Sequence, residues 1–186
     1  GADRKLGPMG RVGAEMAEDR GRAQDVIVGI SGASGAIYGL ACLDLLRAAG
    51  ARTHLIVSRA AELTLKDELG LSLADIAPRA DVLHAAKNIG ASVASGSFKA
   101  RGMIVAPCSV KTLAEIATGT TGTLLSRAAD VTLKERRRLV LMVRESPLHL
   151  GHLRAMVQAT EMGAIIAPPV AAFYAKPQSL EDMVNY

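Results

Sequence analysis

Short apolar runs rich in Val, Ile and Leu alternate along the chain with segments whose hydrophobic residues recur at helical spacing. The runs have the length and composition of buried strands. They predict strands at residues 26–30, 52–57, 82–84, 102–107, 139–143 and 164–167. The periodic segments predict helices at 37–49, 60–69, 113–117, 124–137 and 150–162, with a last one from residue 180. This alternation indicates an α/β fold on a parallel sheet with right-handed crossovers.

The pattern fits one domain over residues 25–186, and we expect the chain end to cut its last helix short. Residues 1–24 are rich in Gly, Arg and Glu with little periodicity, so we expect a disordered leader or a tag remnant there. Residues 71–81 carry turn signals and a short helix. Residues 85–99 form a loop whose length and small polar side chains make it a candidate binding loop.

The turn between the first strand and the first helix, residues 31–36, contains only Ser, Gly and Ala. It places backbone N–H groups at a helix N-terminus, where small side chains let a ligand approach, and such a site favours an anion, most often phosphate. Ser34 adds a hydroxyl donor. The alternative is a plain turn that binds no ligand.

The spacing of this turn argues against two common nucleotide motifs. Gly29, Gly32 and Gly35 do not match the dinucleotide fingerprint, and the next strand is followed by Ser58 and Arg59, not by an acid for a ribose. A P-loop needs Gly-Lys-Ser/Thr, which this turn lacks. A mononucleotide is therefore favoured over NAD or ATP.

Ligands of parallel α/β sheets bind beyond the carboxyl ends of the strands. Hydroxyls, special turns and charges lie together in the segments just past those ends: residues 31–34, Ser58, residues 109–112, Arg144 with Glu145, and residues 168–174. We therefore expect one binding rim there. Ser109 and Thr112 alternatively serve only as helix N-caps.

Arg127 and Lys134 are seven residues apart on one predicted helix and so share a face. With Arg144 they form a candidate cationic pocket, and the alternative is a solvated face paired with Asp130 and Glu135. Residues 136–138 are interpreted as such a solvated face.

Three further polar groups have two interpretations each. Glu145 is a candidate acid or base, or the structural partner of Arg144. Tyr174 is a candidate substrate contact or an aromatic residue at the rim. His149 and His152 are interpreted as packing or capping residues, because no further ligands at suitable spacing indicate a metal site.

Composition narrows the functional class. The 186 residues carry a net charge of +4 and only five aromatic residues, three Tyr and two Phe. Without basic clusters interleaved with aromatics, nucleic-acid binding is disfavoured and small anionic substrates fit better. No apolar run reaches membrane-spanning length. Cys42 and Cys108 are expected to be reduced thiols of a cytoplasmic protein, and the 49% hydrophobic content suggests an oligomer.

Taken together, the motifs resemble those of the UbiX-type flavin prenyltransferases. The matching stretches run in order over almost all of residues 26–184: Gly29-Ile-Ser-Gly-Ala-Ser-Gly-Ala36, Ser95-Gly-Ser97, Pro107-Cys-Ser-Val-Lys-Thr112, Arg127-Ala-Ala-Asp-Val131, Leu133-Lys-Glu-Arg136, Val143-Arg-Glu-Ser-Pro-Leu148 and Phe173-Tyr-Ala-Lys-Pro-Gln178. The resemblance implies a Rossmann-like, doubly wound, three-layer flavoprotein, similar in fold to the flavin decarboxylases and often assembled as a dodecamer.

The resemblance also implies an activity: transfer of a dimethylallyl group from dimethylallyl monophosphate to N5 and C6 of reduced FMN. The product, prenylated FMN, is the cofactor of UbiD-type decarboxylases. FMN would be held by Gly32, Ala33, Ser34, Ser58, Ser109, Val110, Lys111, Thr112 and Arg144. The dimethylallyl phosphate would meet Ser95, Arg127, Lys134, Glu145 and Tyr174, some from neighbouring subunits. Glu68 matches a further active-site glutamate, and Glu68, Lys134, Glu145 and Tyr174 are the candidate catalytic residues.

The chain departs from the family in two places. It stops at Tyr186, before an Arg of the final helix that grips the phosphate in family members, and Arg138 replaces a usual proline. Two rival functions stay open: an FMN-dependent decarboxylase of the phosphopantothenoylcysteine or peptidyl-cysteine type, and a non-catalytic flavin carrier. The chain has no aspartate-rich run for Mg²⁺, so we expect a metal-independent reaction with the monophosphate.

Overall fold

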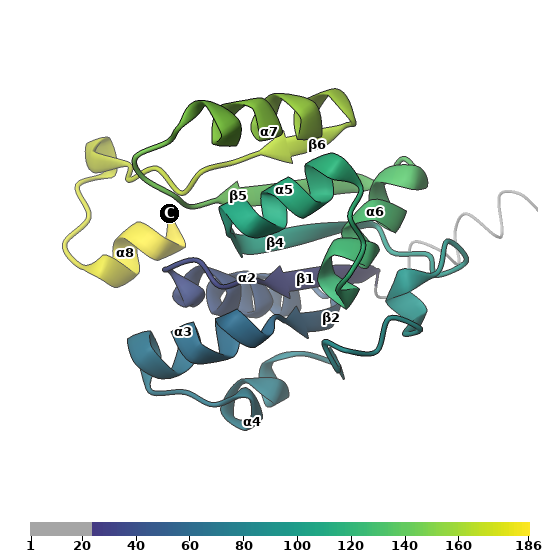
Figure 1. Cartoon of the computed structure of the whole chain (residues 1–186). Helices are drawn as coiled ribbons and strands as arrows, with labels where there is room; N and C mark the ends of the chain where they lie inside the picture. The colour runs from purple at the N-terminus through teal and green to yellow at the C-terminus, as the bar shows by residue number, and fades with distance from the viewer. Residues whose placement is uncertain (1–23) are drawn as a thin grey trace, which may run out of the picture.

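The computed structural model describes residues 24–186 (Figure 1), so all of the expected leader except Gln24 lies outside the described residues. A six-stranded sheet with strand order β3-β2-β1-β4-β5-β6 forms the centre, and every pair of neighbouring strands is parallel. The strands are β1 (Asp25–Ile30), β2 (Arg52–Val57), β3 (Val82–His84), β4 (Gly102–Cys108), β5 (Arg138–Val143) and β6 (Ala164–Ile166). The α/β, Rossmann-like prediction is confirmed.

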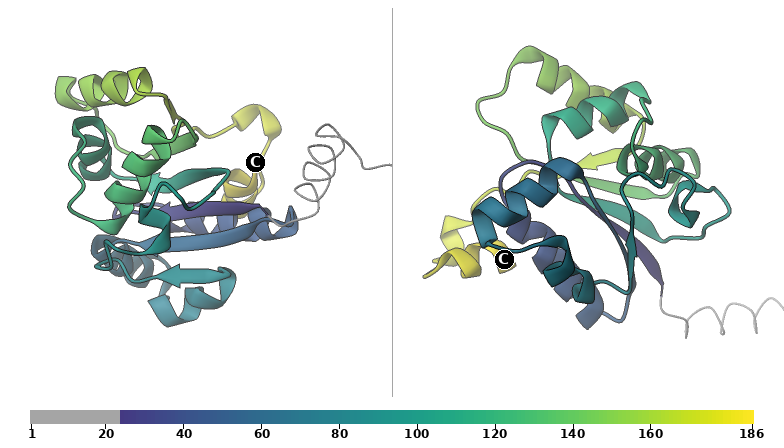
Figure 2. Two further views of the ribbon diagram at one scale, coloured as in Figure 1. Left: turned by 90° about the vertical axis from the view of Figure 1, so that its right-hand side faces the viewer. Right: turned by 60° about the horizontal axis from the view of Figure 1, so that its bottom comes forward.

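Helices cover both faces of this sheet, which gives the three layers visible in the right-hand view of Figure 2. One layer holds α2 (Ala36–Ala48), α3 (Arg59–Leu69) and α4 (Leu73–Ile76), and the other holds α5 (Val110–Thr118), α6 (Leu124–Lys134) and α7 (Leu150–Glu161). A last helix, α8 (Leu180–Asn185), lies against α2. None of the helices described has the length and apolar character needed to cross a membrane.

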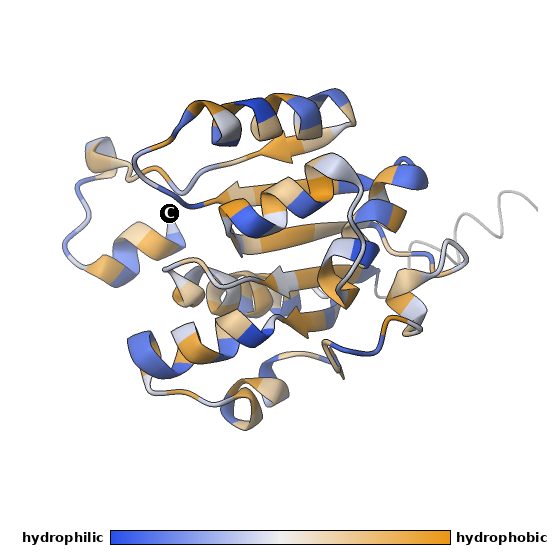
Figure 3. Ribbon diagram, in the orientation of Figure 1, coloured by the Kyte–Doolittle hydropathy of each residue, from blue (hydrophilic) through white to orange (hydrophobic). Residues whose placement is uncertain are grey.

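Alternation along the strands explains the two cores. In β1, Ile27 faces the layer of α5 and α6, whereas Val28 and Ile30 face α2 and α3. Figure 3 shows the resulting hydrophobic strands at the centre of the molecule. Helix α2 packs closely on β4, because a Cβ at Gly39 would lie only 2.5 Å from the carbonyl oxygen of Ala106. Small residues at this contact bring the helix N-terminus and the strand end together.

Two predicted helix boundaries were wrong, and the caps explain why. Helix α5 starts at Val110, not at 113, because the Ser109 side chain accepts a hydrogen bond from the Thr112 N–H. Helix α6 ends at Lys134, and Arg136 then adopts a positive φ of 56° that no helix interior allows. The predicted solvated face at 136–138 is also wrong for Arg137, whose guanidinium donates to the carbonyl oxygens of Gly96 and Phe98.

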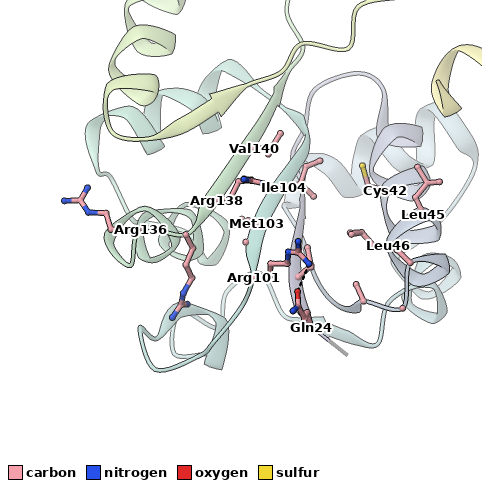
Figure 4. A pocket seen from close by; sticks show the side chains of 16 residues that line it. Gln24, Cys42, Leu45, Leu46, Arg101, Met103, Ile104, Arg136, Arg138 and Val140 are labelled. Atoms are coloured by element: carbon pink, nitrogen blue, oxygen red, sulfur yellow. Dashed lines mark hydrogen bonds between the residues drawn. The ribbon is translucent and has the colours of Figure 1, made fainter. Parts of the chain in front are cut away.

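The described helices cover only half of one face of the sheet. On the face that α2 covers, the apolar side chains of β5 and β6 are not part of the packed core, and Ile165 is 46% exposed. A groove of about 1130 Å³ begins beside α2 and continues over the first residues of β4 and β5. Figure 4 shows Leu45, Ile104 and Val140 in it, with Arg101 at its mouth.

Candidate functional site

Three turns meet at the edge of the sheet where the strands end, called here the carboxyl edge. They are the β1–α2, β2–α3 and β4–α5 turns, and strand order reverses between β1 and β4, the point at which such sheets bind ligands. Buried Ser31 ties two of these turns together. Its hydroxyl donates to the carbonyl oxygen of Pro107 at 2.8 Å and accepts from the Ser109 N–H at 2.7 Å.

The N-terminus of α2 binds a side chain of the protein itself. The Glu68 carboxylate accepts hydrogen bonds from the Gly35 N–H at 2.9 Å and the Ala36 N–H at 3.1 Å. Gly35 has a φ of 100°, a conformation that glycine adopts without strain. The sequence indicated these N–H groups for a phosphate, but they already bind an anion, the Glu68 carboxylate. Glu68 lies on α3, 33 residues after Gly35 in the chain.

The environment of Glu68 favours its charged form. Partial desolvation raises the pKa of Glu68, but hydrogen bonds from Ser34, Gly35 and Ala36 and the nearby charge of Arg144 outweigh it, so the net shift is downward. Ser34, Glu68 and Arg144 thus form one connected polar group at the carboxyl edge. The sequence named all three residues but gave no indication of this contact.

Among the described residues, the N-terminus of α5 is capped by its own Ser109 and not by a carboxylate from another helix. Ser109 accepts from the Thr112 N–H at 3.2 Å and donates to the Thr112 hydroxyl at 3.1 Å, so the capping interpretation of Ser109 is confirmed. Val110 and Lys111 occupy the first helical positions, where the N–H groups have no carbonyl partner within the helix. The Lys111 ammonium is exposed and lies 3.7 Å from Glu115. This helix end offers backbone donors to an anion.

Close packing also shapes the β1–α2 and β2–α3 turns. A Cβ at Gly32 would lie 2.4 Å from the Cβ of Ala60 in α3, so Gly32 permits contact between two parts of the protein. Ser58 caps α3 by accepting from the Ala61 N–H at 3.1 Å. Beside Ser58 is a cavity of about 260 Å³ whose lining includes Lys87 and Thr123.

The segments after β5 and β6 place further polar groups in solvent. Arg144 and Glu145 are exposed, and the Glu145 carboxylate accepts from the Ser146 N–H at 3.0 Å. No ion pair joins Arg144 to Glu145 among the described residues, so the alternative of a structural pair is not supported. Tyr174 is 79% exposed, and its hydroxyl accepts from the Tyr186 hydroxyl at 2.9 Å.

A second polar group lies at the amino edge, where β4 and β5 begin. The Lys134 ammonium is 2.7 Å from the Glu135 carboxylate, and both lie next to Gly96. The Ser95 hydroxyl is hydrogen-bonded to that of Ser97 at 2.9 Å. Arg127 is exposed two turns earlier on α6. In Figure 1 this end of α6 lies opposite the end of the sheet that carries α8.

Within one chain this position keeps Lys134 apart from Arg144, so a single chain does not form the expected three-cation pocket. Lys134 precedes β5 and Arg144 follows it, and the six residues of that strand span roughly 20 Å. Each cation also has a carboxylate at its own edge, Glu135 for Lys134 and Glu68 for Arg144. A single chain therefore presents two separate polar groups.

Comparison with known proteins shows the family. A sequence model described as Flavoprotein matches residues 14–186. The flavin prenyltransferase UbiX of Escherichia coli K12 is 58% identical over 161 residues, which cover 86% of this chain and 85% of the relative. The chain belongs to the UbiX family of flavin prenyltransferases.

Solved UbiX structures share the fold closely. AnUbiX, in complex with FMN and dimethylallyl pyrophosphate, superposes with a TM-score of 0.87 at 48% identity, covering 88% of this chain and 87% of that one. A dodecameric FMN-dependent UbiX-like decarboxylase from Escherichia coli O157:H7 gives 0.84 at 45%, with 87% and 88% covered. The cypemycin decarboxylase CypD, at 14% identity and a TM-score of 0.64, shares the fold alone.

Other chemistry-bearing residues have structural roles. His149 caps α7, with Nδ1 accepting from the Gly151 and His152 N–H groups, so its capping interpretation is confirmed. Both cysteines are free, and burial raises the pKa of the Cys108 thiol to about 12, which makes it a poor nucleophile. Among residues 24–186 no cluster of three or more His, Cys, Asp or Glu is arranged to bind a metal ion.

Proposed function

We propose that this protein joins the dimethylallyl group of dimethylallyl monophosphate to N5 and C6 of reduced FMN, with release of phosphate. Family membership at 58% identity over most of the chain is the observation that carries this proposal. FMN is the flavin because AnUbiX and the dodecameric relative are both described with it. The rival decarboxylases share only the fold with this chain.

The carboxyl edge fits a flavin mononucleotide. Its turns carry small residues next to the exposed hydroxyl of Ser34, the half-buried hydroxyls of Ser58 and Ser109, and the backbone donors at the start of α5, which suits a ribityl chain and a phosphate. Because Glu68 occupies the N-terminus of α2, the phosphate belongs at the N-terminus of α5, with Val110, Lys111 and Arg144. The rest of the FMN contacts the other residues of these turns: Gly32, Ala33, Ser34, Ser58, Ser109 and Thr112. Bound and reduced, FMN supplies the nucleophilic ring atoms.

The prenyl phosphate needs groups from both edges of the sheet. Glu145 and Tyr174 lie past the strand ends, whereas Lys134 and Ser95 lie at the amino edge. One site that contains all of them, with Arg127, must combine the carboxyl edge of one subunit with the amino edge of another. The protein accordingly works as a homo-oligomer, for which the dodecamer of the E. coli O157:H7 relative is the expected form.

The residues of this composite site divide the work. Lys134 and Arg127 stabilise the departing phosphate, as fixed cations do in a site shielded from water. Glu145 exchanges a proton with the phosphate oxygen, and the hydroxyls of Ser95 and Tyr174 orient the phosphate. Glu68 fixes Ser34 and the first turn beside the flavin. No step of this scheme requires a metal ion.

Mass spectrometry of the flavin tests the proposal. We expect the protein, incubated with reduced FMN, dimethylallyl monophosphate and EDTA, to yield FMN that carries one added dimethylallyl group. Unchanged FMN would indicate a carrier, and carbon dioxide released from a cysteine-terminated substrate would indicate a decarboxylase. A parallel assay with dimethylallyl pyrophosphate determines which phosphate is the substrate, since AnUbiX was solved with the pyrophosphate.

The same proposal extends to location and product. Two free cysteines, one of them fully buried, suit a reducing compartment, and we assign the protein to the cytoplasm. A UbiD-type decarboxylase is the consumer of prenylated FMN. The domain that performs the reaction comprises residues 25–186, together with Gln24, whose side-chain oxygen accepts from Arg101 at 2.7 Å.

A further inference from the structure

Arg137 makes contacts that the proposed reaction has not used. It lies in the turn between α6 and β5, and its guanidinium reaches a loop about forty residues earlier in the chain. One nitrogen donates to the carbonyl oxygen of Gly96 at 3.0 Å, and the other donates to the carbonyl oxygen of Phe98. The two hydrogen bonds fix the backbone on both sides of Ser97.

The same loop lies against the end of α6. A Cβ at Gly96 would lie 2.5 Å from the Glu135 carboxylate and 3.1 Å from the Lys134 ammonium, so the loop passes directly beside this ion pair. Ser95, immediately before Gly96, directs its hydroxyl to Ser97 at 2.9 Å. Arg137 therefore holds the backbone of the loop that carries Ser95 and Ser97 and that places Gly96 next to Lys134.

The far end of the loop is anchored independently. The Phe98 ring packs edge-on against the buried His54, with ring centroids 4.8 Å apart. His54 is held in turn by Asp25 and His84, each 3.0 Å from one of its ring nitrogens. With the ring of Phe98 fixed by this network and its carbonyl by Arg137, the segment 95–98 has little freedom relative to α6.

From this geometry we infer that Arg137 is a positioning residue for the prenyl phosphate: it keeps Ser95 and Lys134 in the arrangement that receives the phosphate from a neighbouring subunit. The inference rests on the proposed function. A planar guanidinium binds two carbonyl oxygens at once, and an ammonium at the same place satisfies only one of them well.

The charge of Arg137 has a second effect on the same group. The hydrogen bond and charge of Lys134 lower the pKa of Glu135, and Arg137 adds to this effect from a greater distance. The Glu135 carboxylate lies 2.7 Å from the Lys134 ammonium and keeps it next to Gly96. The neighbouring Arg138 is exposed and makes no hydrogen bond through its side chain among the described residues, which makes Arg138→Ala a matched control.

Steady-state kinetics and hydrogen exchange on the FMN-loaded oligomer test the inference. For Arg137→Ala we expect the KM for dimethylallyl monophosphate to rise about 10-fold or more, as for loss of hydrogen bonds to a charged group. FMN content should match wild type, and amide exchange at residues 95–98 should be faster. The KM and exchange rate of Arg137→Lys should fall between those of wild type and Arg137→Ala. Arg138→Ala should match wild type in KM, FMN content and amide exchange.

Two results would overturn the inference. The first is a KM and an exchange rate at 95–98 that match those of Arg138→Ala. The second is a loss confined to kcat with the loop still protected. If Arg137→Ala does not fold, Arg137→Lys decides by the same readouts. A wild-type protein that transfers no prenyl group would refute the proposed function, and the exchange rates would still show whether Arg137 orders the loop.

Discussion

At the level of single residues, the carboxyl edge depends on side chains that complete helix ends. Glu68 closes the N-terminus of α2, and Ser109 caps α5 while its own N–H is bound by Ser31. These contacts hold the β1–α2 turn against the last turn of α3 and against the β4–α5 turn. We propose the N-terminus of α5 for the flavin phosphate, because the N-terminus of α2 already binds the Glu68 carboxylate.

The charge of Glu68 makes the stability of this edge depend on pH. Its pKa is lower in the folded protein, so the folded state binds fewer protons and the stabilisation is present above the ordinary pKa of about 4.5. It is lost as the pH falls through the folded value. We expect Glu68→Gln to cost about 0.3–1 kcal/mol at pH 7, typical of a charge at an exposed helix end, and to flatten this acid dependence.

Urea denaturation between pH 3 and pH 7, with pH values chosen around the Glu68 titration, measures this effect. Asp67→Asn is the control, because Asp67 is exposed on the same helix and makes no hydrogen bond through its side chain among the described residues. A Glu68→Gln profile as steep as that of the control would contradict the assignment of the acid-labile stability to Glu68.

Gly32 gives a second prediction at this scale. A larger side chain at Gly32 meets another part of the protein first, because a Cβ there would lie 2.4 Å from the Cβ of Ala60. We expect Gly32→Val to lower the stability of flavin-free protein by about 1–3 kcal/mol, the usual cost of overpacking. The double variant Gly32→Val with Ala60→Gly should recover part of this loss. No recovery in thermal unfolding would place the clash elsewhere.

At the level of elements, the strands were predicted more accurately than the helix ends. Unbroken apolar runs such as 102–107 specify buried strands from sequence alone. The end of α6 depends on the positive φ of Arg136, and the role of Arg137 depends on carbonyl groups far away in the chain, neither of which a local pattern contains. The contact of Glu68 with α2 was missed for the same reason, since it joins two helices.

The Asp25–His54–His84 network predicts acid sensitivity of the β1–β2–β3 half of the sheet. Burial, and then the charge of His54, lower the pKa of His84 in the folded protein. Below about pH 6.5 the His84 imidazole is protonated in the unfolded chain but stays neutral in the folded protein. The unfolding free energy therefore falls as the pH decreases. We expect His84→Gln to weaken this dependence.

Denaturation at several pH values between 5 and 8, the range in which histidines titrate, provides the measurement. Lys87→Gln, an exposed change in the loop that follows β3, serves as the control. A His84→Gln variant that loses stability with acid as steeply as wild type would show that the dependence comes from other groups.

At the level of the whole molecule, two features indicate an oligomer: the uncovered half of one sheet face and the two separated polar groups. On the face that α2 covers, the apolar side chains of β5 and β6 lack a covering helix among the elements described, and Lys134 and Arg144 lie at opposite ends of β5. We expect Ile165→Glu, a charge on this 46% exposed position, to dissociate the oligomer and lower prenyl transfer together. Light scattering during size-exclusion chromatography measures the first effect, and Lys66→Glu on exposed α3 is the control.

Subunit mixing tests most directly the claim that one site for prenyl transfer is built from two edges of two subunits. Lys134→Ala disables the amino edge and Glu145→Gln the carboxyl edge, so each variant alone should form little prenylated FMN. In a one-to-one hetero-oligomer, random pairing makes about a quarter of the sites intact. Mass spectrometry of the flavin should then show about a quarter of the wild-type yield. A mixture no more active than its two components would contradict the account.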